Sequence, residues 1–225
     1  MGTFGINKNN RLYWLGRYTE RVYQGIENIR IINDKILDNT PVDIADFRRR
    51  LGITSTTFST SEEFCSRYAF DRTMPESLLS TADSMLGNGM VLRDILGTQT
   101  LSYIQMAVSA LEEASVSQAF DVQLQWVMDD IMAFRGSYAE YIEESEVRNT
   151  IRSGASVERV GTLLRLEVED AIIIKEINKL VARLHRTHLE YDEEKLQIIQ
   201  QFLSNKEGVL NRFDVLESVE SLFRI

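Results

Sequence analysis

Two copies of one short pattern, 138 positions apart, constrain the fold of this chain more than any other feature of its sequence. Residues 16–21 and residues 154–159 both read Gly-x-x-x-Glu-Arg, and a valine follows each copy. On a helix the glycine lies one turn before the glutamate and on the same face. Because glycine has no Cβ, another backbone can approach closely there. The repeat therefore predicts a paired structural feature in which two helices pack against each other.

The charged residues of the two copies need partners. Neighbouring residues on a helix point about 100° apart, so the glutamate and the arginine of one copy cannot pair well with each other. We expect reciprocal ion pairs between the copies instead, because a buried charge without a partner is strongly destabilising. The predicted partners are Arg159 or Arg165 for Glu20, and Arg17 or Arg21 for Glu158.

A binding or catalytic pocket is the alternative interpretation of the same residues. The glutamates would then act as acid, base or metal ligand, and the arginines would bind an anion. We favour the structural interpretation, because buried ion pairs are common in proteins without any catalytic duty.

Apolar residues recur at three- and four-residue steps along most of the chain, which is typical of helices with one buried face. The first such stripe begins at Asn9 or Asn10 and runs to about Leu37. Only two prolines occur, and no segment has the pattern of a strand. A hydroxyl-rich loop is predicted at 54–60. Further helices are predicted at about 44–51, 61–68, 75–96, 98–114, 117–132, 146–184, 193–203 and 214–223, with Gly97 ending one of them and Gly136 breaking or bending the chain after another.

These segments predict an all-α fold, a single helical bundle with long antiparallel helices and two internally repeated Glu-Arg motifs. At 225 residues the chain can form one large domain. We expect a single domain over 1–225, with a core at about 9–184 and a C-terminal helical appendage at about 190–225.

The composition argues against several classes of protein. A formal net charge of −9 is wrong for a sequence-independent nucleic-acid binder, which needs a basic footprint. No apolar run approaches the ~20 residues of a membrane-spanning helix. The first residues lack the basic region and the apolar core of a signal peptide, and the lone cysteine, Cys65, forms no internal disulfide. We therefore expect a cytoplasmic protein that binds neither nucleic acid nor membrane.

Candidates for metal binding or nucleophilic catalysis are few. A di-iron site in a helical bundle needs Glu-x-x-His pairs, and neither His185 nor His188 has a glutamate three residues before it. No phosphate-binding loop, dinucleotide fingerprint or catalytic serine motif occurs. Cys65 is a weak candidate nucleophile, because the nearby Glu62 and Glu63 raise the pKa of its thiol. We expect neither a metal nor a cofactor.

Residues 11–21, with the sequence Arg-Leu-Tyr-Trp-Leu-Gly-Arg-Tyr-Thr-Glu-Arg, resemble the N-terminal signature of a bacterial family, the alpha-E domain. This family is a helical domain with a recurring Glu-Arg motif. Two further segments are similar to it: Asn88 with the Leu-Arg-Asp at 92–94, and the Phe-Arg-Gly at 134–136. The second Glu-Arg copy departs from the family pattern, since Ser153 and Ala155 replace the leucine and the arginine that flank the glycine. The resemblance covers roughly residues 9–175.

The resemblance implies which proteins this chain works beside more than which reaction it performs. Such domains occur beside, or fused to, circularly permuted ATP-grasp proteins that resemble peptide ligases, and often beside transglutaminase-like proteins. They are thought to take part in making or tagging peptides, and no catalytic residue is carried over. The motif residues, structural or substrate-binding, are Arg17, Glu20, Arg21, Asn88, Arg93, Glu158, Arg159 and Arg165.

Two functions from different classes follow as expectations. In the first, the chain is a non-catalytic accessory protein of an ATP-grasp-type amide ligase and positions the ligase or its peptide substrate. In the second, it is itself a transferase or ligase component whose Glu/Arg cluster binds an acidic or phosphorylated substrate. We favour the first, because no nucleophile or general-base constellation accompanies the arginines. The substrate and the oligomeric state, a homo-oligomer included, stay open.

Overall fold

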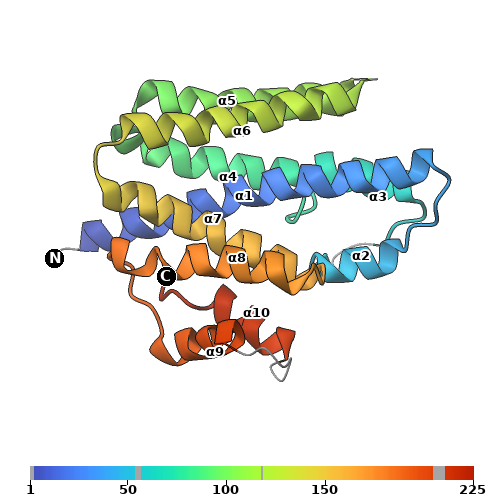
Figure 1. The fold of residues 1–225 in the computed structure, drawn as a ribbon. Helices are drawn as coiled ribbons and strands as arrows, with labels where there is room; N and C mark the ends of the chain where they lie inside the picture. Colours follow the sequence, from blue (N-terminus) through green and yellow to red (C-terminus); the bar gives the residue numbers. More distant parts are fainter. Residues whose placement is uncertain (1–2, 54–56, 118, 205–210) are drawn as a thin grey trace. The chain divides into compact units, whose positions relative to one another are not determined.

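The computed structural model describes residues 3–53, 57–117, 119–204 and 211–225, and every regular element among them is a helix (Figure 1). The all-α prediction is confirmed, whereas part of the predicted loop at 54–60 lies outside the described residues. Within the described part of the chain, no helix combines the length and the apolar character that crossing a membrane requires. The helices are α1 (Thr3–Leu37), α2 (Ile44–Arg50), α3 (Ser61–Phe70), α4 (Leu78–Val91), α5 (Arg93–Val116), α6 (Phe120–Tyr141), α7 (Ser145–Arg165), α8 (Asp170–Val181), the short 3₁₀ helix η1 (Leu184–Arg186), α9 (Glu193–Ser204) and α10 (Arg212–Glu220).

The chain divides into two compact units. Unit 1 contains residues 1–20 and 144–225, and unit 2 contains residues 21–143. Helix α1 begins in unit 1 and ends in unit 2. That both units form one domain, as the sequence analysis expects, stays a prediction.

Three helices of unit 2 begin where a side chain accepts a hydrogen bond from a free helical N–H group. Asp43 caps α2 in this way, Thr60 caps α3 and Ser77 caps α4. Such caps supply a partner for donors that the first turn of a helix leaves unpaired. Because Ser77 is the cap, α4 begins at Leu78 and not at residue 75, where the predicted helix starts.

Gly97 and Gly136 behave differently, although the sequence predicts an interruption at both. Gly97 has a φ of +72°, a conformation that favours glycine, and α5 is kinked there, at the place where the sequence predicts that one helix ends and the next begins. Gly136 instead lies inside α6, which continues to Tyr141. The predicted break at Gly136 is wrong, because one glycine costs a helix only about 1 kcal/mol and the flanking Phe134 and Tyr138 are buried.

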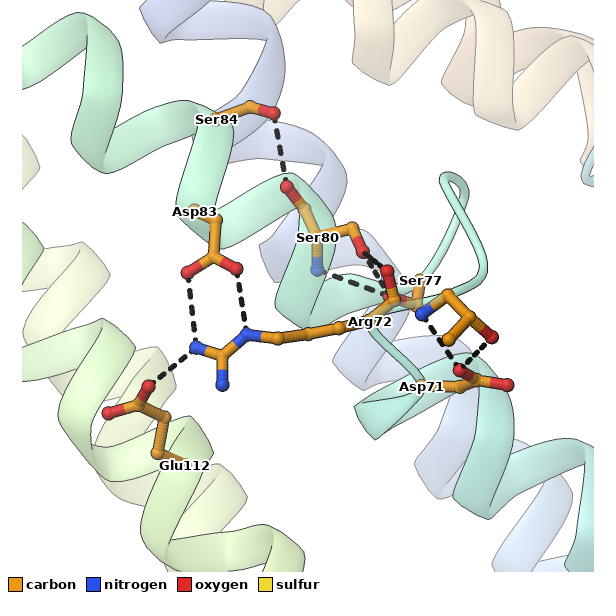
Figure 2. A network of polar contacts seen from close by, with 8 residues as sticks. Asp71, Arg72, Ser77, Ser80, Asp83, Ser84 and Glu112 are labelled. Carbon is orange, nitrogen blue, oxygen red and sulfur yellow. Dashed lines mark hydrogen bonds and ion pairs between the residues drawn. The ribbon is translucent and has the colours of Figure 1, made fainter.

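A network of polar contacts connects the segment between α3 and α4 to two helices of unit 2 (Figure 2). The Arg72 guanidinium binds Asp83 of α4, with Nε 2.9 Å from Oδ2, and Glu112 of α5, with Nη2 2.5 Å from Oε1. Next to it, Asp71 accepts hydrogen bonds from the backbone and the hydroxyl of Thr73. The charged ends of Arg72 and its partners are half exposed, so these contacts orient the segment and stabilise it little.

In unit 1, α7 and α8 replace the single long helix predicted at 146–184. Helix α7 ends at Arg165, and Glu167 adopts a φ of +55°, which is rare for any residue other than glycine. The chain turns at this point, and α8 packs against α7. The prediction is wrong because the apolar spacing continues across the turn, from Leu164 to Ile172, and no glycine or proline marks it.

One apolar cluster forms the core of unit 1. Tyr13 of α1 contributes an aromatic ring to it, and α9 and α10, which the sequence analysis sets apart as an appendage, share it with α7 and α8. An isolated antiparallel bridge between Tyr191 and Phe223 joins the start of α9 to the C-terminal segment. The buried members are Tyr13, Val157, Val160, Leu164, Ile173, Ile177, Leu180, Leu184, Leu189, Leu196, Ile199, Val215, Val219, Leu222 and Phe223.

Candidate functional site

Helices α1 and α7 of unit 1 touch through their glycines. A Cβ added to Gly16 would overlap the carbonyl oxygen of Ile151 and lie 2.8 Å from its carbonyl carbon. A Cβ added to Gly154 would likewise overlap the carbonyl oxygen of Tyr13 and lie 2.9 Å from its carbonyl carbon. Each glycine thus packs on the residue three positions before the other glycine, so the two contacts are related by the same 138-residue offset as the motifs. We call this arrangement the glycine contact.

The first predicted ion pair joins these helices through Arg17 and Glu158. Nε and Nη2 of Arg17 both lie 2.7 Å from Oε2 of Glu158. The two side chains are only 8% and 4% exposed, so the pair is almost fully removed from water. The guanidinium carbon of Arg17 also lies 5.2 Å from the centre of the Trp14 ring, whose face attracts a cation.

The second predicted ion pair joins the same helices in the opposite sense. Nε of Arg159 lies 2.7 Å from Oε1 of Glu20. The Glu20 side chain is 2% exposed, whereas the Arg159 side chain is 32% exposed. Water therefore reaches this pair from the arginine side, and we expect it to be the weaker of the two.

The two pairs are not exact counterparts, because the two copies differ after the glycine. Under the 138-residue offset Glu20 corresponds to Glu158, but Arg17 corresponds to Ala155. Glu158 therefore meets the arginine that directly follows Gly16, whereas Glu20 meets Arg159 of the Glu-Arg dipeptide itself. The second copy has no arginine at the place that corresponds to Arg17, so an exact counterpart of the pair between Arg17 and Glu158 cannot form.

Burial and charge set the protonation of this cluster. Burial by itself lowers the pKa of Arg17, but the neighbouring Glu158 carboxylate and then Tyr13 outweigh it, so the pKa lies above its usual value. Burial raises the pKa of the Tyr13 phenol, although Arg17 opposes this shift. At neutral pH the cluster accordingly contains a charged guanidinium and a neutral phenol. Tyr13 and Trp14 lie within three residues of Gly16, but nothing in the sequence marks them as members of the cluster.

The structure places the remaining motif residues elsewhere. Of the two partners predicted for Glu20, the structure pairs it with Arg159, whereas Arg165 forms an ion pair with Glu220 of α10. Arg21, the last residue of the first motif, lies on α1 within unit 2. Asn88 lies in α4 and Arg93 begins α5, and both also belong to unit 2. Unit 1 thus brings together Arg17, Glu20, Glu158 and Arg159.

Two buried hydroxyl groups of α7 are also not identified by the sequence. Thr150 and Ser153 are 1% and 0% exposed, and among the described residues neither hydroxyl has a hydrogen-bond partner. A buried polar group without a partner costs about 1–3 kcal/mol. One turn further along, Ser156 accepts a hydrogen bond of 2.8 Å from Nη1 of Arg183. No spacing in the sequence distinguishes the paired hydroxyl from the two unpaired ones.

The two histidines lie close together in sequence but have different neighbours. Nδ1 of His188 lies 2.5 Å from Oε1 of Glu146, at the start of α7. The His185 ring instead packs edge-on against Tyr191. In the described ranges, no group of three or more His, Cys, Asp and Glu side chains is placed to hold a metal ion. That the protein contains no metal stays a prediction.

Cys65 lies in the core of unit 2 and is 4% exposed. Burial, together with the nearby Glu62 and Asp121 carboxylates, raises the pKa of its thiol to about 12. Glu63, which the sequence analysis also named, instead accepts a hydrogen bond from the Ser59 N–H at 2.7 Å. The thiol is therefore protonated at neutral pH, as expected for a weak nucleophile.

This shift predicts how the stability of the protein depends on alkaline pH. The pKa of the thiol is 9.0 in its ordinary state and about 12 in the fold, so folding favours the neutral thiol. Its contribution to the free energy of unfolding is complete below pH 9 and is lost as the pH rises to 12. Urea denaturation at pH 8 to 11.5 should show a steeper decline for the wild type than for Cys65→Ala. Parallel curves for the two proteins would contradict this account.

The fold and the site define a class of protein, an all-helical chain in which two helices far apart in sequence meet through paired glycines and reciprocal Glu-Arg ion pairs. Residues 9–204 match the model of the Alpha-E family, described as "a predicted alpha-helical domain with a conserved ER motif". The match includes most of the chain and both Glu-Arg dipeptides, so this chain belongs to the Alpha-E family. No curated protein and no solved structure matches it significantly.

Proposed function

We propose that this chain is a non-catalytic helical partner of an ATP-grasp-type peptide ligase, and that it positions the ligase or its peptide substrate. Its membership of the Alpha-E family supports the setting, because the resemblance to that family implies an ATP-grasp partner. The observation that carries the non-catalytic role is the burial of both motif glutamates. Glu20 and Glu158 are 2% and 4% exposed, and each carboxylate is held by an arginine of the opposite helix. Carboxylates placed in this way hold two helices together and are not accessible to a dissolved substrate.

The alternative is an enzyme of the same pathway, a transferase or ligase component whose Glu/Arg cluster binds an acidic or phosphorylated substrate. One observation favours it: the Arg159 side chain is 32% exposed, so an anion can approach one guanidinium of the cluster. That guanidinium already binds Glu20, and the more deeply buried Arg17 is 8% exposed. A substrate would have to displace Glu20 or separate α1 from α7, and we therefore prefer the partner role.

A reconstitution with an ATP-grasp protein from the same genome tests the proposal. We expect the two proteins to co-elute in size-exclusion chromatography, and ATP-dependent amide formation to require the ATP-grasp protein. Adding this chain should lower the KM for the peptide substrate, because a positioned substrate reacts at a higher effective concentration. ADP release and peptide mass measure the reaction.

The same experiment separates the two candidate functions. Product formed from ATP and peptide by this chain alone would establish the enzyme alternative. No complex, together with unchanged kinetics of the ATP-grasp protein, would remove the partner proposal. A variant that keeps the fold, such as Gly136→Ala on the exposed side of α6, should behave like the wild type and serves as the control.

A further inference from the structure

A solvent-open cavity of about 390 Å³ lies in unit 2, formed by residues of that unit alone. It is bounded by the C-terminal end of α1, by α3, and by the residues where α5 ends and α6 begins. Its size is within the usual range for sites that bind small molecules. The apolar part of its wall includes Ile36, Leu37 and Phe70. The thiol of Cys65 also lines the cavity.

Among the residues that the structure describes, the charged side chains that line the cavity are two carboxylates, those of Glu62 and Asp121. Asp121 accepts a hydrogen bond of 3.1 Å from the amide of Asn33, and Glu62 accepts hydrogen bonds from its own N–H and from the Thr60 hydroxyl. These donors are neutral, so they leave both negative charges in place. In the part of the chain that the structure describes, no Lys, Arg or His side chain forms an ion pair with either carboxylate.

The helix ends near the cavity reduce this negative charge without cancelling it. Glu62 lies in the first turn of α3 and Asp121 in the first turn of α6. The N-terminus of a helix carries about half a positive charge, so two such ends offset about one of the two negative charges. Burial raises the pKa of the Cys65 thiol, and the two carboxylates, which lie near it, act in the same direction.

The rest of unit 2 has the same sign of charge. Unit 2 contains ten Lys and Arg residues and 18 Asp and Glu residues, so it carries eight of the nine net negative charges of the chain. A negative field over the whole unit attracts cations and repels anions on their approach to the cavity.

We propose that this cavity binds a small organic cation, an alkylammonium compound whose charged end lies at Glu62 and Asp121 and whose hydrocarbon chain packs on the apolar wall. A metal ion alone would leave the apolar wall uncovered, and an anion would face two like charges. An alkylammonium compound matches both parts of the lining, because its charge pairs with the carboxylates and its hydrocarbon chain packs on the apolar wall. The proposal is independent of the ATP-grasp partnership.

A titration of the ¹⁵N-labelled protein with n-hexylammonium chloride tests this site. We expect saturable shifts of the amide signals at residues 62–66 and 114–117, with a Kd on the order of 1 mM, as is reasonable for so small a ligand. Sodium hexanoate and hexanol, at the same concentration and ionic strength, should give no saturable shift there. A lysine derivative blocked at both backbone ends is the second ligand, and it shows whether a lysine side chain fits as well as a free amine.

Variants locate the binding on the two carboxylates. The double variant Glu62→Gln/Asp121→Asn should weaken binding of n-hexylammonium about tenfold, at about threefold for each charge removed. Glu140→Gln removes an exposed carboxylate from the other end of α6 and should leave the Kd unchanged. Equal binding of hexanoate or hexanol, an unaffected double variant, or shifts that never saturate would each overturn the proposal.

The single cysteine provides a second measurement that does not require a tight ligand. A methanethiosulfonate reagent transfers its alkylthio group to the Cys65 thiolate: a disulfide bond forms between the two sulfur atoms as the S–SO₂ bond breaks and methanesulfinate leaves. Relative to a free cysteine derivative, the trimethylammonioethyl reagent should react faster than the sulfonatoethyl reagent, and n-hexylammonium should slow it. In Glu62→Gln/Asp121→Asn this charge preference should fall about tenfold. A preference for the anionic reagent would also overturn the proposal.

Discussion

Replacing Gly154 by alanine is expected to lower the free energy of unfolding by about 3 kcal/mol or more. The new Cβ would overlap the carbonyl oxygen of Tyr13, and this atom belongs to the backbone of α1 and cannot rotate away. The helices would have to separate, which would also lengthen the ion pair between Arg17 and Glu158. Gly16→Ala should have an effect of similar size, since its Cβ would meet the backbone of Ile151.

Gly136→Ala is the matched control for these variants. Gly136 also lies inside a long helix, but an added Cβ there has no neighbour within 4 Å. Alanine is the better helix former, so this variant should be more stable by about 0.5–1 kcal/mol. Urea denaturation of all three variants measures the difference. If Gly154→Ala were as stable as Gly136→Ala, Gly154 of α7 would not lie against the backbone of Tyr13 in α1.

The Glu158→Gln variant should lower the free energy of unfolding by about 3–5 kcal/mol. The change removes the negative charge that Nε and Nη2 of Arg17 share, in a place where water can replace it only poorly. The guanidinium would then be buried next to a neutral amide. The double variant Glu20→Arg/Arg159→Glu, which reverses the other pair, should recover part of the loss that Glu20→Arg alone causes.

Asp83→Asn is the control for the loss of a charge. Asp83 pairs with Arg72 at a half-exposed position, so its removal should change the stability little (Figure 2). The outcome at Glu158 also bears on function. A Glu158→Gln protein of unchanged stability that no longer supports peptide ligation would show that the Glu-Arg cluster is a binding or catalytic site, and the enzyme alternative would replace the partner proposal.

The pairing of α1 with α7 could be predicted from the sequence, because both the glycine contact and the ion pairs leave a local signal in it. A glycine one turn before a glutamate indicates a close helix contact, and a charge that cannot pair within its own helix needs a partner on another. Together these signals predict Arg17 or Arg21 as the partner of Glu158 and Arg159 or Arg165 as the partner of Glu20, and the structure contains the pairs with Arg17 and Arg159. They left Arg21 and Arg165 as alternatives, since spacing alone does not give the distance between two helices.

Other features depend on packing that no short pattern records. The turn at Glu167 has a positive φ without a glycine, and apolar spacing that suits one long helix suits two helices folded over one core equally well. Gly136 looks like a break in the sequence, but its buried neighbours in α6 keep the helix continuous. The cavity of unit 2 is lined by residues of α1, α3, α5 and α6, so it exists only once those helices are packed.

Because unit 1 consists of residues 1–20 and 144–225, its two parts leave the ribosome at different times. The N-terminal half of the glycine contact is synthesised first, but its partner follows only after all of residues 21–143. During that interval α1 displays Tyr13 and Arg17 without Ile151, Gly154 and Glu158. Unit 2 is contiguous and can fold as soon as it has emerged, whereas unit 1 has to wait for the final third of the chain. Ribosome-bound chains stopped near residue 143 should therefore bind chaperones through their first 20 residues.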